Sequence, residues 1–170
     1  MGPNIAQLNG AMGRPKRLEG FSYVGRYRYF LTTCTLDRQR AFEAQAVATS
    51  TIDQFLTTAR FEQFAVPAYC LMPDHLHMLV EGRADEADFQ RFVKLAKQRS
   101  GAAYALKSKR RLWQKSYYER VLREHEDSKD VARYIVANPV RAGLVQSATE
   151  YPYLGSDEWS LSDLIDSIID

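Results

Sequence analysis

The hydrophobic positions along the chain follow two periods, which predict strands and helices in turn. Runs rich in β-branched and aromatic residues predict strands at residues 27–36, 64–72, 75–81 and 113–122. Apolar positions with helical spacing predict helices at residues 46–60, 86–106, 129–137 and 160–169. The order strand, helix, strand, strand, helix, strand is typical of a ferredoxin-like, split βαβ fold of the α+β class, with helices on one face of an antiparallel sheet.

Prolines and aspartates mark the boundaries of these elements. Pro73 and Asp74 form a tight turn that joins two strands as a hairpin, while Pro67 indicates a bulge or an edge position. Asp85 is expected to cap the long helix, and Pro139 must end the helix at 129–137.

The 170 residues suit one domain, flanked by two short segments of different composition. Residues 1–22 form a loose basic arm without periodicity, and residues 154–170 form an acidic tail. The chain has no apolar run of the roughly 18 residues that a membrane span needs, and its start lacks the apolar core of a secretory signal. We therefore expect a cytoplasmic protein in which Cys34 and Cys70 are buried thiols.

The net charge of +2 conceals an uneven distribution. Residues 91–123 contain eleven Lys or Arg and one acid, whereas residues 147–170 contain six acids and no base. The basic segment is either a solvated helix face or a surface that binds nucleic-acid phosphates. The candidate DNA-binding residues are Arg14, Lys16, Arg17, Lys94, Lys97, Arg99, Lys109, Arg110 and Arg111. The acidic tail could occupy the same surface as an autoinhibitor.

Two of the three histidines form the motif His75-Leu76-His77 on a predicted strand. Side chains two residues apart on a strand point to the same face, so both imidazoles can hold one metal ion while Leu76 points into the core. The alternative is a pair of ordinary surface or core histidines. Two imidazoles with an oxygen ligand and open positions suit Mg²⁺ or Mn²⁺ bound to a phosphate, although the spacing also permits Zn²⁺.

Tyr134 and Asn138 lie four residues apart, on one face of a predicted helix. The phenol could act as a nucleophile beside a metal-bound phosphate, and the amide oxygen of Asn138 could be the third metal ligand. The alternative is a core tyrosine and an asparagine that caps the helix before Pro139. Arg133 and Arg141 flank this block and either contact the phosphate or are surface bases.

Three segments, PDHLHMLV, WQKSYYERVLR and YIVANPVRAGLV, together resemble the single-tyrosine HUH transposases. The resemblance covers residues 22–153 and is strongest to the REP-associated tyrosine transposases. It implies a catalytic domain in which His75, His77 and Asn138 bind a divalent metal and Tyr134 is the nucleophile. It also implies a single-stranded DNA substrate with a hairpin, a 5′-phosphotyrosine intermediate and a free 3′-OH. Members of the family include single chains and swapped dimers, so a homodimer is one expectation.

Neighbouring residues leave some roles open. Tyr117 and Tyr118 lie on the predicted fourth strand and are rival nucleophiles. Asp74 stands where many relatives carry Asn, and it serves either the turn or the metal. His125 is expected at the surface.

These features predict a metal-dependent endonuclease and strand transferase that acts in DNA transposition at the bacterial nucleoid. One alternative is a domesticated protein that binds DNA hairpins with little or no cleavage. Another is a phosphodiesterase that uses water, which would give product without a protein-linked species. An intact set of His75, His77, Tyr134 and Asn138 favours the first.

Overall fold

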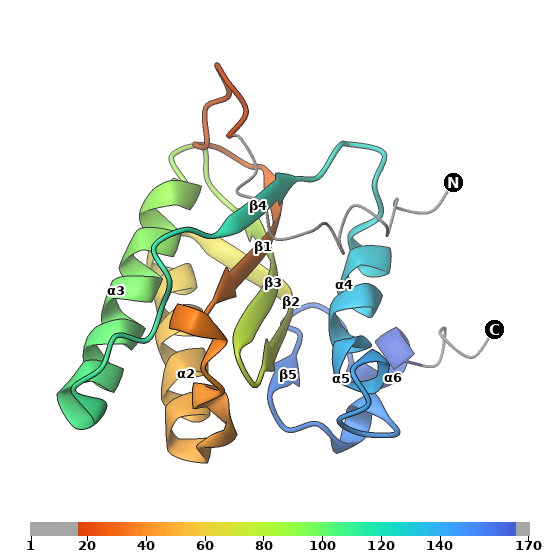
Figure 1. The fold of residues 1–170 in the computed structure, drawn as a ribbon. Coiled ribbons are helices and arrows are strands. Elements are labelled where there is room, and N and C mark those ends of the chain that lie inside the picture. The colour runs from red at the N-terminus through yellow and green to blue at the C-terminus, as the bar shows by residue number, and fades with distance from the viewer. Residues whose placement is uncertain (1–16, 166–170) are drawn as a thin grey trace.

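The computed structural model describes residues 17–165, which are built around an open sheet. Within these residues five strands pair antiparallel in the order β4-β1-β3-β2-β5 (Figure 1). The strands are β1 (Arg28–Cys34), β2 (Phe64–Met72), β3 (His75–Gly82), β4 (Tyr118–Val121) and β5 (Leu154–Gly155). The predicted α+β fold with an antiparallel, ferredoxin-like sheet is confirmed.

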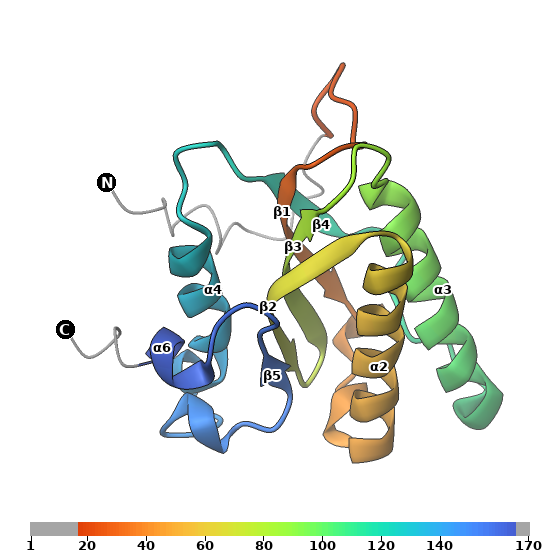
Figure 2. The same ribbon diagram turned by 180° about the vertical axis from the view of Figure 1, so that it is seen from behind.

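Helices cover both faces of this sheet (Figures 1 and 2). α2 and α3 form the predicted helix layer on one face, while α4, α5 and α6 cover the other face, which the sequence-based prediction leaves open. The helices are α2 (Gln45–Phe61), α3 (Phe89–Ser108), α4 (Ser128–Val136), α5 (Asn138–Arg141) and α6 (Leu161–Ile165), and the short 3-10 turns are η1 (Leu36–Arg38), η2 (Ala41–Glu43) and η3 (Ala148–Glu150). Between residues 17 and 165, no helix has the length and apolar character that a membrane span requires.

The side chains of β1 explain why both faces are covered. Tyr29 and Leu31 pack with Phe89 of α3, whereas Phe30 between them packs with Ile135 of α4. All five side chains are fully buried. Because successive strand residues point to opposite faces, an apolar run of this kind needs a helix layer on each side. Hydrophobic burial therefore holds the tyrosine-bearing helix α4 against the sheet.

The long helix begins later than predicted, because a different aspartate caps it. Asp88 accepts a hydrogen bond from the backbone N–H of Arg91 at 3.0 Å, and α3 starts at Phe89. Asp85, the predicted cap, instead pairs with Arg26 at 2.8 Å. Either aspartate suits a helix N-terminus, and the burial of Phe89 in the core determines which one serves.

The fourth strand is shorter than predicted, because Trp113 is drawn into the core. Its indole N–H donates to Ser100 of α3 at 2.9 Å, and its ring lies 5.7 Å from that of Phe55. Only an isolated bridge to Thr35 connects it with the sheet among the described residues. The predicted bulge at Pro67 is confirmed by a register shift in the β2–β3 pairing on either side of this residue.

The predicted C-terminal tail is partly built into the fold. β5 pairs with β2, and Leu164 of α6 is buried in the core beneath α4. The carboxylate of Asp157 accepts the backbone N–H of Val66 at 2.6 Å, and Glu158 pairs with Arg83. These two acids are therefore bonded within the domain, and the autoinhibitory role of the acidic tail stays a prediction.

Candidate active site

The two histidines bring ring nitrogens together on the α4 side of the sheet. His75 and His77 are alternate residues of β3, and Leu76 is buried on the opposite face, as the strand period requires. The Nε2 atoms of the two histidines lie 3.1 Å apart. Bonds between a divalent ion such as Zn²⁺ and an imidazole nitrogen are about 2.0–2.1 Å long, so a single ion can bind both atoms.

Asp74 and Thr32 fix the orientation of the two rings. An Asp74 oxygen lies 2.6 Å from Nδ1 of His75, and the Thr32 hydroxyl lies 2.8 Å from Nδ1 of His77. Because a carboxylate only accepts, His75 carries its proton on Nδ1 and presents a lone pair at Nε2. The Thr32 hydroxyl can accept from His77 in the same way. Metal-binding histidines are typically held by such outer partners.

Arg38 holds the Asp74 carboxylate and lies in a short segment with a strained backbone. Its Nε donates to the second Asp74 oxygen at 2.8 Å, and its Nη1 lies 2.8 Å from the Cys34 sulfur. Asp37 and Arg38 have φ values of 53° and 56°, a left-handed conformation that costs a non-glycine residue roughly 1–2 kcal/mol. Backbone strain of this kind persists where surrounding contacts enforce it, and here it places the guanidinium behind the histidine pair.

Burial keeps both imidazoles neutral. It lowers the pKa of His77 well below the usual range, and the neighbouring His75 lowers it further. Burial also lowers the pKa of His75, although the Asp74 carboxylate opposes this effect. At pH 7 both rings are therefore uncharged, which is the form that binds a metal ion. The residues thus fit a divalent cation.

Tyr134 reaches the same region from α4. Its ring is buried and lies 6.1 Å from the Phe30 ring, and the His77 ring lies 5.5 Å from the same Phe30. Burial raises the pKa of the Tyr134 phenol, while the positive charge of Arg141 partly opposes the rise. The phenol is therefore protonated at pH 7, and nearby positive charge favours its ionisation.

Hydrogen bonds hold the loop before α4 and cap its last turn. At its start, the Arg28 guanidinium donates to the backbone oxygens of Arg123 and Glu126 at 2.7 and 2.8 Å, which holds the loop before the helix. At its end, the Asn138 Nδ2 donates to two carbonyl oxygens of the last turn at 3.1 Å each. The Arg28 bonds thus tie the start of the helix to β1, and the burial of Ile135 and Val136 holds its last turn against the sheet that carries the histidine pair.

Arg141 occupies the space beside Tyr134 and Asn138. Its Cζ lies 3.8 Å from the centre of the Tyr134 ring, and its Nη2 donates to the Asn138 oxygen at 2.9 Å. The amide oxygen proposed as a metal ligand is therefore bonded to a guanidinium. The described His, Cys, Asp and Glu residues contain no group of three or more that could hold a metal, so a third protein ligand would be of another type, such as this amide.

The rival tyrosines point to opposite faces of the sheet. Tyr118 lies on the α4 side, with its ring 6.4 Å from that of Phe30. Tyr117 packs on the α3 side, and its hydroxyl accepts a hydrogen bond from Arg17 at 3.2 Å. Tyr118 is thus the rival that shares a face with the histidines. His125 is exposed in the loop before α4, as predicted.

The structure separates the predicted DNA-binding bases into groups. Arg14 and Lys16 lie outside the described residues. Lys94 is exposed on α3. Three bases are engaged by neighbouring side chains: Arg17 by Tyr117, Arg99 by Thr58 and Arg133 by Asp130. Four others come together at one place: Lys97, Lys109, Arg110 and Arg111.

These four bases, with Lys115, line a cleft of about 710 Å³ between α3 and the segment 109–115, which we call the basic cleft. No acidic residue is among its described lining residues. Lys97 forms the inner wall, because its Nζ donates to the carbonyl oxygens of Gln114 and Ser116 at 2.9 and 3.2 Å. Burial lowers the pKa of Lys97 to about 8. Lys97 therefore shapes the cleft, and Lys109, Arg110, Arg111 and Lys115 supply its charge.

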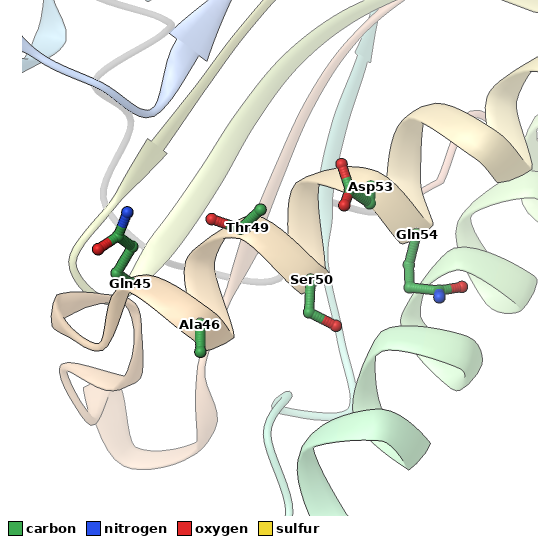
Figure 3. A pocket seen from close by; sticks show the side chains of 6 residues that line it. All are labelled: Gln45, Ala46, Thr49, Ser50, Asp53 and Gln54. Atoms are coloured by element: carbon green, nitrogen blue, oxygen red, sulfur yellow. The ribbon is translucent and has the colours of Figure 1, made fainter.

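A second hollow, of about 530 Å³, lies along the outer surface of α2 (Figure 3). Its lining contains Thr49, Ser50, Asp53 and two glutamines. These described residues include no histidine and no base, and Asp53 is the single charged group among them. This hollow fits neither a phosphate nor the metal chemistry of the histidine pair.

Sequence reasoning did not identify Thr32, Arg38 or Lys115. Thr32 acts through its position opposite His77 in the β1–β3 register, which no sequence period reveals. Arg38 depends on a left-handed turn at non-glycine residues, for which the sequence carries no signal. Lys115 lay within the basic segment but belonged to the predicted strand.

Comparison with known families gives one match that spans most of the chain. The profile of the family described as "Transposase IS200 like" matches residues 23–138. This range contains the histidine pair, Tyr134 and Asn138.

Curated proteins and solved structures point in the same direction. A "Putative REP-associated tyrosine transposase" of Haemophilus influenzae is 25% identical over 142 residues, which cover 74% of this chain and 77% of that protein. A REP-associated tyrosine transposase of Escherichia coli is 27% identical over 94 residues, 55% of each chain.

A REP-associated tyrosine transposase solved with a REP hairpin superposes with a TM-score of 0.68 and 22% identity, over 84% of this chain and 82% of that one. A "putative transposase" structure from Deinococcus radiodurans gives 0.51 and 25%, over 64% and 88%.

Proposed function

Because this chain belongs to the IS200-like transposase family, we propose that it cuts and rejoins single-stranded DNA through a covalent bond to Tyr134, at sites flanked by REP-like hairpins. The observation that carries the proposal is the placement of the two converging histidine nitrogens and Tyr134 around Phe30, on one face of the sheet. The hairpin is inferred from the relative solved with a REP hairpin, which shares this fold.

The protein's own groups account for each part of the proposed reaction. His75 and His77, with Asn138, would hold Mg²⁺ or Mn²⁺, and such an ion offsets the negative charge that grows on the phosphate oxygens. The Tyr134 oxygen attacks the phosphorus and loses its proton, while the bond from phosphorus to the 3′ oxygen breaks and that oxygen takes up a proton. The 5′ end is then bonded to Tyr134, and the free 3′-OH can reverse the step. No water-activating base is needed.

Labelled hairpin oligonucleotides test this function. DNA labelled at either end, drawn from repeats near the gene, is incubated with the protein and Mn²⁺ or Mg²⁺ and resolved on a denaturing gel. We expect a metal-dependent adduct that retains the label of the downstream fragment, because the tyrosine takes its 5′ phosphate. Cleavage without an adduct would mean hydrolysis by water, and binding without cleavage on every substrate would identify a hairpin-binding protein.

The basic cleft is the proposed path of the DNA backbone. Replacing Arg110 and Arg111 with alanine should weaken binding and reduce the slope of log K against log salt by about 1.4–1.8, since each phosphate contact contributes about 0.7–0.9. The charge-matched control replaces Lys94 and Lys107, which are exposed on α3 but do not line the cleft. Binding is measured at several salt concentrations. An equal effect of both double variants would remove the cleft from the DNA path.

The assembly and location of the protein stay predictions. We expect it to act on chromosomal DNA in the bacterial cytoplasm. In the one chain described, the histidine pair and Tyr134 already lie around the same Phe30. A homodimer would bring together two such sets of side chains.

A further inference from the structure

The side chain of Asn138 has all its polar atoms engaged within the described structure. Nδ2 donates to the carbonyl oxygens of Tyr134 and Ile135, which fixes which way the amide points. The remaining atom, Oδ1, accepts from Nη2 of Arg141 at 2.9 Å. A cation at this distance opposes the approach of a divalent ion to the same oxygen. The third proposed metal ligand is therefore masked.

Arg141 is placed where a phosphate bound near Tyr134 could attract it. Its guanidinium lies over the Tyr134 ring, and its positive charge acts on His77 as well. The residue is exposed at the end of the one-turn helix α5, and Gly143, two residues later, has a φ of 69°. An arginine in this position is open to DNA, and its planar fork matches the oxygens of a phosphate.

We propose that Arg141 couples DNA binding to metal binding: it holds the Asn138 oxygen in the free protein and transfers to a DNA phosphate, which releases that oxygen to the metal. This inference rests on the proposed function, because it takes the metal site and the DNA substrate from it. It adds that Arg141 is the residue that keeps the Asn138 oxygen from the metal until DNA is bound.

The coupling has a reciprocal form. If DNA raises the affinity for metal by some factor, the metal raises the affinity for DNA by the same factor. Couplings between two sites are typically about 5–150-fold. Free protein should therefore bind Mn²⁺ weakly, through the histidine pair alone, and a hairpin oligonucleotide should raise the affinity by at least about fivefold.

A double-mutant cycle separates masking from simple charge repulsion. Mn²⁺ binding is measured by electron paramagnetic resonance on four proteins without DNA: unsubstituted, Arg141→Ala, Asn138→Ala, and both together. All four carry Tyr134→Phe, so that the same proteins can then be titrated with uncut hairpin DNA. Circular dichroism confirms that each is folded, and Arg133→Ala, which removes a neighbouring cation that pairs with Asp130, is the matched control.

We expect Arg141→Ala to tighten Mn²⁺ binding at least about fivefold when Asn138 is present and less than twofold when it is absent. We also expect DNA to tighten Mn²⁺ binding in the protein with Arg141 more than in Arg141→Ala. An equal gain with and without Asn138 would show that Arg141 only repels the ion, and no gain would show that it masks nothing; either result overturns the proposal. The Mn²⁺ titrations are made on proteins without the phenol oxygen, so they do not depend on the adduct. If the protein with Tyr134 forms no adduct in the cleavage assay, that result contradicts the proposed function and not this inference.

Discussion

A Tyr134→Phe variant is expected to form no covalent adduct with DNA and to lose DNA cleavage by on the order of a thousandfold or more, because it lacks the attacking oxygen. The substitution removes one atom and keeps the ring that packs against Phe30 and beneath Arg141. The fold and the affinity for DNA should therefore change little. End-labelled oligonucleotides on a denaturing gel measure the adduct, and a filter-binding titration measures the affinity.

Tyr118→Phe is the control for this prediction. Tyr118 lies on the same face of the sheet and near the same Phe30, and its hydroxyl could in principle reach the DNA. We expect the Tyr118→Phe variant to form the adduct at nearly the normal rate. If this variant lost the adduct while Tyr134→Phe retained it, the nucleophile would be Tyr118, on β4 instead of α4.

A Thr32→Val variant is expected to weaken Mn²⁺ binding about 10–100-fold without touching a metal ligand. The hydroxyl of Thr32 is the hydrogen-bond partner of His77 Nδ1, at 2.8 Å, and valine has the same shape without it. The His77 ring then loses the contact that fixes its proton and its orientation. The stronger variant His77→Ala removes a ligand outright and should lower the affinity further, but it also leaves a cavity in a buried position.

Thr33→Val is a matched control on the next residue. Thr33 is fully buried, whereas Thr32 is half-buried; the Thr33 side chain points to the other face of the sheet, and its hydroxyl has no hydrogen-bond partner among the described residues. The readout is thermal unfolding with and without Mn²⁺, because a ligand at one hundred times its Kd stabilises the folded state by about 2.7 kcal/mol. We expect Thr32→Val to lose about half of this stabilisation or more, and Thr33→Val to keep it. Equal stabilisation of both variants would contradict the role of Thr32.

The parts of the site that follow a local period could be predicted from the sequence. His75 and His77 share a face because strand side chains alternate, and Tyr134 and Asn138 lie together at the end of α4 because helix positions four apart are neighbours. The fold class followed from the order of the elements in the same way. Each of these depends only on residues close together in the chain.

The parts that depend on tertiary contacts could not be predicted. The partner of His77 is set by the β1–β3 register. The late start of the fourth strand, at Tyr118, is set by Trp113 entering the core beside α3. The run of bases gave no indication that Lys97 turns inward while Arg110 and Arg111 face the cleft. A charge pattern reveals composition, whereas burial depends on packing between elements that lie far apart in sequence.

The anchoring of α4 at both ends affects the fate of the DNA after the first cut. In the proposed reaction the severed 5′ end becomes an extension of this helix, which Arg28 holds at its start and the buried Ile135 and Val136 hold at its end. A tether this short and stiff keeps the broken end at high effective concentration beside the retained 3′-OH. Rejoining of the cut strand should then be faster than dissociation of the broken end. Exchange with another strand would therefore depend on how long a second DNA end stays bound at the site.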